Sequence, residues 1–90
     1  MTKDPYKITV KKSNGSIERF DPGKIAQVVQ AAGLKTEEAA ILATKVALWA
    51  VNQNKAVIKS SMIRTKVTQM LKKVSKSAAN LFIWYKKNEG

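Results

Sequence analysis

One segment with a two-residue hydrophobic period, followed by helical periods through the rest of the chain, restricts the fold most strongly. The stretch YKITVKK alternates Ile8 and Val10 with polar neighbours, and SIERF contributes Ile17 and Phe20. The Ser-Asn-Gly triplet between the two stretches is typical of a tight turn. We therefore expect a β-hairpin over about residues 6–20.

Two registers of this hairpin compete. A two-residue Asn-Gly loop pairs Lys12 with Ile17, whereas a three-residue Ser-Asn-Gly loop pairs Val10 with Glu18. The second register is preferred because it gathers Val10 and Phe20 on one apolar face. It also places Lys12 and Glu18 on that face, near the tip of the hairpin.

Apolar residues recur at helical spacing after the hairpin. Asp21 can cap a first helix that has proline at its first position, and Ser60 or Ser61 is expected to cap the third. Val57 and Ile58 could form a short extended stretch between the second and third helices. The expected helices cover about residues 22–33, 36–51, 60–74 and 77–87.

The length of 90 residues suits one domain with a modest core. We therefore predict a single α+β domain over residues 1–90. In it an N-terminal β-hairpin, or a small three-stranded sheet, covers a four-helix bundle.

The composition excludes several kinds of chemistry. The chain has no cysteine and no histidine, which removes thiol nucleophiles, disulfides and the usual zinc ligands. We expect no catalytic residues and no metal site in the protein itself. The chain also lacks the apolar run of a signal peptide or a membrane span, so we expect a cytoplasmic protein.

Positive charge is concentrated in the second half of the chain. The formal net charge is +11; residues 1–38 carry +2, and residues 39–88 carry +10 without a single acidic side chain. Such a field attracts polyanions, although lysines scattered over a solvated surface produce the same count. Lysine greatly outnumbers arginine, which disfavours bidentate readout of bases or phosphates.

The glycines and lysine of KKSNGSIERFDPGK superficially suggest a phosphate-binding loop. That motif requires four residues between its glycines and a hydroxyl residue after its lysine. Here seven residues separate Gly15 from Gly23, and Ile25 follows Lys24. The phosphate-loop interpretation is therefore rejected, and the absence of GxGxxG removes a dinucleotide-binding fold as well.

The order of segments resembles the ATP-cone, the regulatory nucleotide-binding domain of many ribonucleotide reductases and of the repressor of their genes. The similarity rests on ITVKKSNGSIERFDPGKI, VIKSSMIRTKVTQML and LFIWYKK, and it spans the chain from about Ile8 to Lys87. The sequence departs from the family pattern at Ser13, where arginine is usual, and at Met62, where an acid is common.

The resemblance implies a nucleotide site built from several segments. Glu18 matches the acid that accepts a hydrogen bond from the adenine amino group, and Lys24 matches a phosphate ligand. An apolar slot for adenine fits Val10, Phe20 and Ile25, although each of these alone also fits a plain core residue. The implied nucleotide-binding residues are Lys12, Glu18, Asp21, Lys24, Ser60, Arg64 and Lys87, with Lys86 competing for the role of Lys87.

The expected function is allosteric sensing of ATP or dATP, with or without Mg²⁺, and without catalysis. A partner protein or a second copy of the chain would respond to the occupied state. The alternative is a small nucleic-acid-binding protein that uses the lysine-rich surface of residues 39–88. Few stacking aromatics support that alternative, since Tyr6, Trp49 and Trp84 each fit packing equally well.

Overall fold

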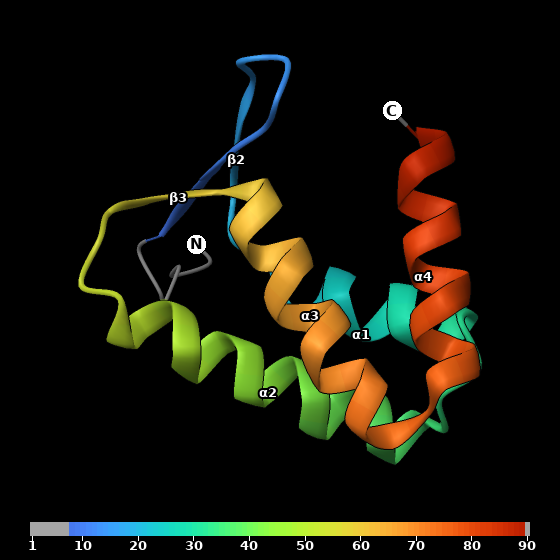
Figure 1. Ribbon diagram of the computed structural model, residues 1–90. Coiled ribbons are helices and arrows are strands. Elements are labelled where there is room, and N and C mark those ends of the chain that lie inside the picture. The colour runs from blue at the N-terminus through green and yellow to red at the C-terminus, as the bar shows by residue number, and fades with distance from the viewer. Residues whose placement is uncertain (1–7, 90) are drawn as a thin grey trace.

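The computed structural model describes residues 8–89, and the side chains of residues 8–83. Three short strands and four helices follow one another in the order β1, β2, α1, α2, β3, α3, α4 (Figure 1). Their bounds are β1 Thr9–Lys11, β2 Ile17–Arg19, α1 Pro22–Ala31, α2 Thr36–Asn52, β3 Val57–Lys59, α3 Ser60–Val74 and α4 Lys76–Glu89. The predicted α+β class is confirmed, with the sheet in its three-stranded form.

Strand β1 lies in the middle of a mixed sheet of order β2-β1-β3. It pairs antiparallel with β2, and Val10 lies opposite Glu18. The three-residue loop is therefore the correct one. Gly15 lies in this loop at a φ of 89°, a conformation that glycine adopts without steric cost. Asn14 Oδ1 accepts a hydrogen bond from the Ser16 amide at 2.9 Å and tightens the turn.

Strand β3 pairs parallel with β1, so that Ile58 lies beside Val10. The predicted extended stretch at Val57 and Ile58 is thus a third strand. It runs directly into α3, whose N-cap is Lys59, and no side-chain oxygen caps that helix. The predicted serine cap is wrong because Ser60 already belongs to the helix. The backbone stays extended through β3 up to Lys59, which therefore becomes the N-cap.

The other helix boundaries differ little from the expectations. Asp21 caps α1, as predicted, through its Oδ1, which accepts a hydrogen bond from the Gly23 amide at 2.9 Å. That helix ends at Ala31, two residues before the glycine expected to end it, because Gly33 has a φ of 121°. Helix α4 begins at Lys76, and Ser75 Oγ accepts a hydrogen bond from the Ala78 amide at 3.2 Å.

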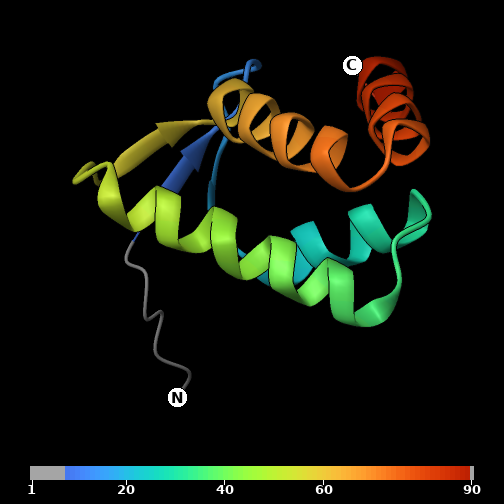
Figure 2. The same ribbon diagram turned by 60° about the horizontal axis from the view of Figure 1, so that its bottom comes forward.

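One hydrophobic core joins the sheet to the helices. Helix α1 packs along α2, α3 packs against α4, and the sheet lies at the C-terminal end of α2 (Figures 1 and 2). Small residues on the buried side of α2 allow close packing, and Trp49 packs against this core half-buried. The most deeply buried large side chains are Val29, Val46, Ile58, Val67 and Leu71.

Truncation of a core leucine tests this packing. Leu71 is fully buried, whereas Leu48 on α2 is 60% exposed. We expect Leu71→Ala to lower the free energy of unfolding by about 2–5 kcal/mol, because it opens a cavity. The matched variant Leu48→Ala should cost less than about 1 kcal/mol. Urea denaturation followed by circular dichroism measures both; similar losses in the two variants would contradict this core.

Candidate functional site

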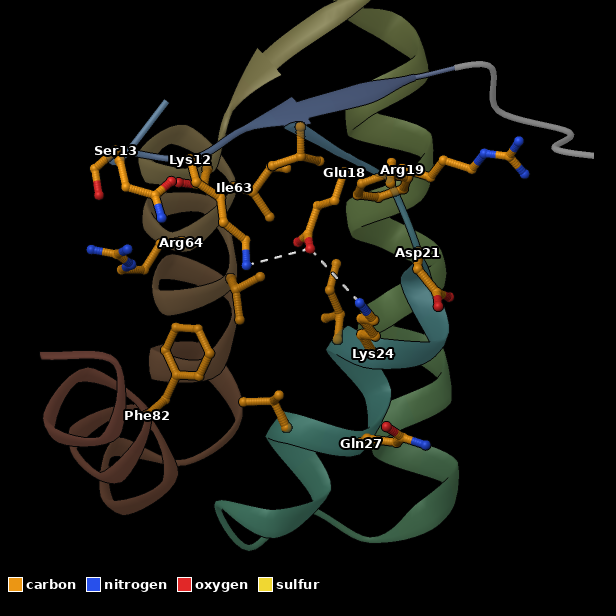
Figure 3. Close-up of a pocket in the computed structure, with 17 residues that line it drawn as sticks. Lys12, Ser13, Glu18, Arg19, Asp21, Lys24, Gln27, Ile63, Arg64 and Phe82 are labelled. Atoms are coloured by element: carbon orange, nitrogen blue, oxygen red, sulfur yellow. Dashed lines mark ion pairs between the residues drawn. The ribbon is translucent and has the colours of Figure 1, made fainter. Parts of the chain in front are cut away.

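A pocket of about 560 Å³ opens between the hairpin, the first turns of α1 and α3, and α4. Its size is that of a small-molecule site. Figure 3 shows side chains from all these elements pointing into the same space. The pocket therefore depends on segments that are far apart in the sequence.

The structure brings together nine of the ten residues that the sequence singles out. Six of them are polar or charged and three are apolar. These pocket residues are Lys12, Glu18, Asp21, Lys24, Ser60 and Arg64, with Val10, Phe20 and Ile25. The side chain of Lys87, and that of its competitor Lys86, lies outside the described residues.

Glu18 is the electrostatic centre of the pocket. Its Oε2 lies 3.4 Å from Lys12 Nζ and 3.8 Å from Lys24 Nζ (Figure 3). The two lysines come from the hairpin and from α1, so Glu18 links these elements. Its side chain is 37% exposed and the lysine side chains are more so, which keeps both ion pairs weak and easily exchanged for other partners.

Arg64 and the N-terminus of α3 form a second cationic wall. Ser60 and Arg64 lie one helical turn apart on the same side of α3. Among residues 8–83, the ion pairs are those of Glu18, so Arg64 has no carboxylate partner there. The uncapped end of α3 adds the partial positive charge of the helix dipole. This wall suits an anion.

Part of the pocket lining is apolar. Val10 and Phe20 are buried, and Ile25 is half-buried on α1. Val67 and Phe82 extend the apolar lining from α3 and α4. A flat heterocycle can lie against such a surface while charged groups at the rim take hydrogen bonds and phosphates.

Asp21 has a different position from the other charged residues. It borders the pocket, but its Oδ1 is already occupied by the Gly23 amide. A β-carbon on Gly23 would lie 3.0 Å from that oxygen, so the glycine leaves room for the cap. The structural role of Asp21 is therefore to hold the first turn of α1, which carries Lys24.

Sequence reasoning missed several pocket residues. Four of them follow helical hydrophobic periods and therefore look like core residues: Val28, Ile63, Val67 and Phe82. Arg19 and Gln27 carry no motif. A usable signal existed on α3. The spacing i, i+3, i+4, i+7 places four residues on one face of this helix: Ser60, Ile63, Arg64 and Val67. Ile63 and Val67 could therefore have been found from Ser60 and Arg64.

The fold and this pocket define a small domain with a nucleotide-sized site between a hairpin and helices. The sequence matches the family described as the ATP cone domain over residues 8–89. The chain therefore belongs to the ATP-cone family, a class of nucleotide-binding regulatory domains, and the resemblance noted in the sequence is confirmed. The sequence matches none of the curated proteins compared with it. No helix in the described part of the chain is long and apolar enough to span a membrane.

The cap of α1 supplies a test of this local geometry. Asp21→Ala removes the oxygen that accepts the Gly23 amide and should lower the free energy of unfolding by about 1 kcal/mol. Asp21→Ser keeps a capping oxygen and should retain most of the stability. Chemical denaturation of the three proteins measures the difference, and equal losses in the two variants would show that the cap contributes nothing.

Proposed function

We propose that this chain binds ATP or dATP in the pocket and acts as an allosteric nucleotide sensor without catalytic activity of its own. The observation that carries the proposal is the convergence of several cations, the carboxylate of Glu18 and an apolar surface on the same pocket of about 560 Å³. Membership of the ATP-cone family supports it. The pocket residues could supply both an apolar surface for the base and cations for the phosphates.

The base would lie against Val10, Phe20 and Ile25, with Glu18 accepting a hydrogen bond from the exocyclic amino group of adenine. Guanine has a carbonyl oxygen at that position and would face the carboxylate with an acceptor. Glu18 would thereby favour adenine over guanine.

The triphosphate would lie toward the cationic wall. Lys24 and Arg64 supply mobile positive charges, and Ser60 lies at the uncapped end of α3. Lys12 lies at the hairpin side of the same space, and Asp21 fixes the turn that carries Lys24. Among the described residues there is no group of three acidic or other metal-binding side chains, so Mg²⁺ would be bound by the phosphates.

Nucleotide binding would rearrange the charges of the pocket. Lys12 and Lys24 both contact Glu18 in this structure, and a triphosphate would compete with Glu18 for them. Because these residues come from the hairpin and α1, and Ser60 and Arg64 from α3, the ligand would draw these elements together. A partner protein or a second copy of the chain could then distinguish the occupied state from the empty one.

Calorimetric titration tests this function. We expect saturable binding of ATP and dATP that Lys24→Ala and Arg64→Ala each weaken by about tenfold or more, since hydrogen bonds to charged groups contribute about 1.5–3 kcal/mol. Glu18→Ala should weaken ATP binding and reduce the preference for ATP over GTP.

Lys45→Ala on α2 is the matched control. Lys45 is exposed and does not line the pocket, so its removal should leave ATP affinity nearly unchanged. The proposal fails if no nucleotide binds at millimolar concentration, or if the control weakens binding as much as the pocket variants do.

A further inference from the structure

The sheet has a second face, opposite the one that carries Val10, Glu18 and Ile58, and we call it the outer face. Side chains alternate along each strand, so the face opposite Val10, Glu18 and Ile58 is formed by the residues on either side of them. Most of these residues are exposed, and three are cationic. The outer face consists of Thr9, Lys11, Ile17, Arg19, Val57 and Lys59. Arg19 also borders the pocket, but its side chain is directed away from Glu18 (Figure 3).

Lys11 and Lys59 are direct neighbours across the parallel pair of β1 and β3. Like charges in this position repel each other and weaken strand pairing. No carboxylate compensates them: the acids among residues 8–83 are Glu18 in the pocket, Asp21 at the start of α1, and Glu37 and Glu38 at the start of α2. The charges on this face are therefore unneutralised within the described part of the chain.

The same charge continues along α3. Lys59 is the N-cap of the helix, and Lys66 and Lys73 follow at intervals of seven residues, which places them on one flank. At about 1.5 Å per residue this line is roughly 20 Å long. We refer to Lys11, Arg19, Lys59, Lys66 and Lys73 as the cationic strip.

We propose that the cationic strip binds the sugar–phosphate backbone of a nucleic acid, independently of the nucleotide pocket. Four of its five residues are lysines, which neutralise phosphates as point charges and read little sequence. Its roughly 20 Å length matches about six nucleotides at about 3.4 Å each. An acidic protein is the poorer fit, because the strip lacks the aromatic residues that anchor protein interfaces.

Fluorescence anisotropy tests the proposal with labelled probes of about 20 nucleotides, several times the length of the strip. The arms are single-stranded RNA, single-stranded DNA and duplex DNA, each of mixed sequence. Binding should be saturable at low salt and insensitive to sequence. The logarithm of the association constant should fall with the logarithm of salt concentration at a slope of about −3.5 for single strands, as expected when five cations displace counterions.

Two double variants with the same change of net charge distinguish binding at the cationic strip from a general effect of net charge. Lys59→Glu with Lys73→Glu alters the N-cap of α3 and an exposed position in its last turn. Lys35→Glu with Lys72→Glu alters the N-cap of α2 and the neighbouring exposed position of α3, which points about 100° away from Lys73. Circular dichroism confirms that both proteins fold.

The strip variant should lose at least about tenfold in affinity at low salt and show a slope shallower by about 1 to 1.5, whereas the control should lose less than about threefold. Excess ATP at constant ionic strength should leave the complex intact. The proposal is overturned by undetectable binding in all three arms, by equal losses in the two double variants, or by displacement with ATP. None of these results bears on the ATP titration, which tests the pocket separately.

Discussion

The parallel pairing of β1 with β3 is the constraint on which the rest of the structure depends. Three residues of each strand join the N-terminal hairpin to a segment almost fifty residues later. Because β3 runs without interruption into α3, this pairing also places the first turn of α3 beside the hairpin. Ser60 and Arg64 thereby line the same pocket as Glu18 and Lys24. Ile58 is buried at the centre of the pairing. The contact between Ile58 and Val10 therefore both buries apolar surface and fixes the position of Ser60 and Arg64.

Hairpin register has an equally direct effect on the pocket. In the observed register Glu18 lies opposite Val10 and faces the pocket between two lysines. A slip of one residue would invert the faces of β2. The carboxylate of Glu18 would then lie on the outer face of the sheet, and the guanidinium of Arg19 would take its place in the pocket. The Ser-Asn-Gly loop, with Gly15 at positive φ and Asn14 bonded to Ser16, selects against that slip.

Local patterns in the sequence predict the hairpin register and the helices, because each rests on neighbours within a few positions. The polar pocket residues came instead from the resemblance to the ATP-cone, which relates segments that are far apart in the chain. The partner and direction of β3 could not be predicted from local patterns, since strand pairing between distant segments has no local signature. The prediction of a serine cap for α3 was wrong for a related reason. Serine is a good N-cap, but the preceding strand keeps the backbone extended up to Lys59, so Lys59 is the N-cap and Ser60 is already helical. Val67 and Phe82 were hidden because a residue can contact both the core and the pocket, and hydrophobic periodicity does not separate the two.

The two faces of the sheet differ in charge: the pocket side carries a carboxylate among its lysines, whereas the outer face carries exposed cations alone among the described residues. On the pocket side the carboxylate of Glu18 offsets part of the charge of Lys12 and Lys24. In the proposed function, an anion would therefore bind tightly there only when it also covers the apolar surface and donates a hydrogen bond to Glu18. The outer face has no carboxylate among the described residues, and its lysines remain in solvent. An electrostatic field of this kind speeds the approach of any polyanion but discriminates poorly between them. In the proposed function, selectivity would therefore depend on the pocket, where the register of a three-residue turn places Glu18 between two lysines.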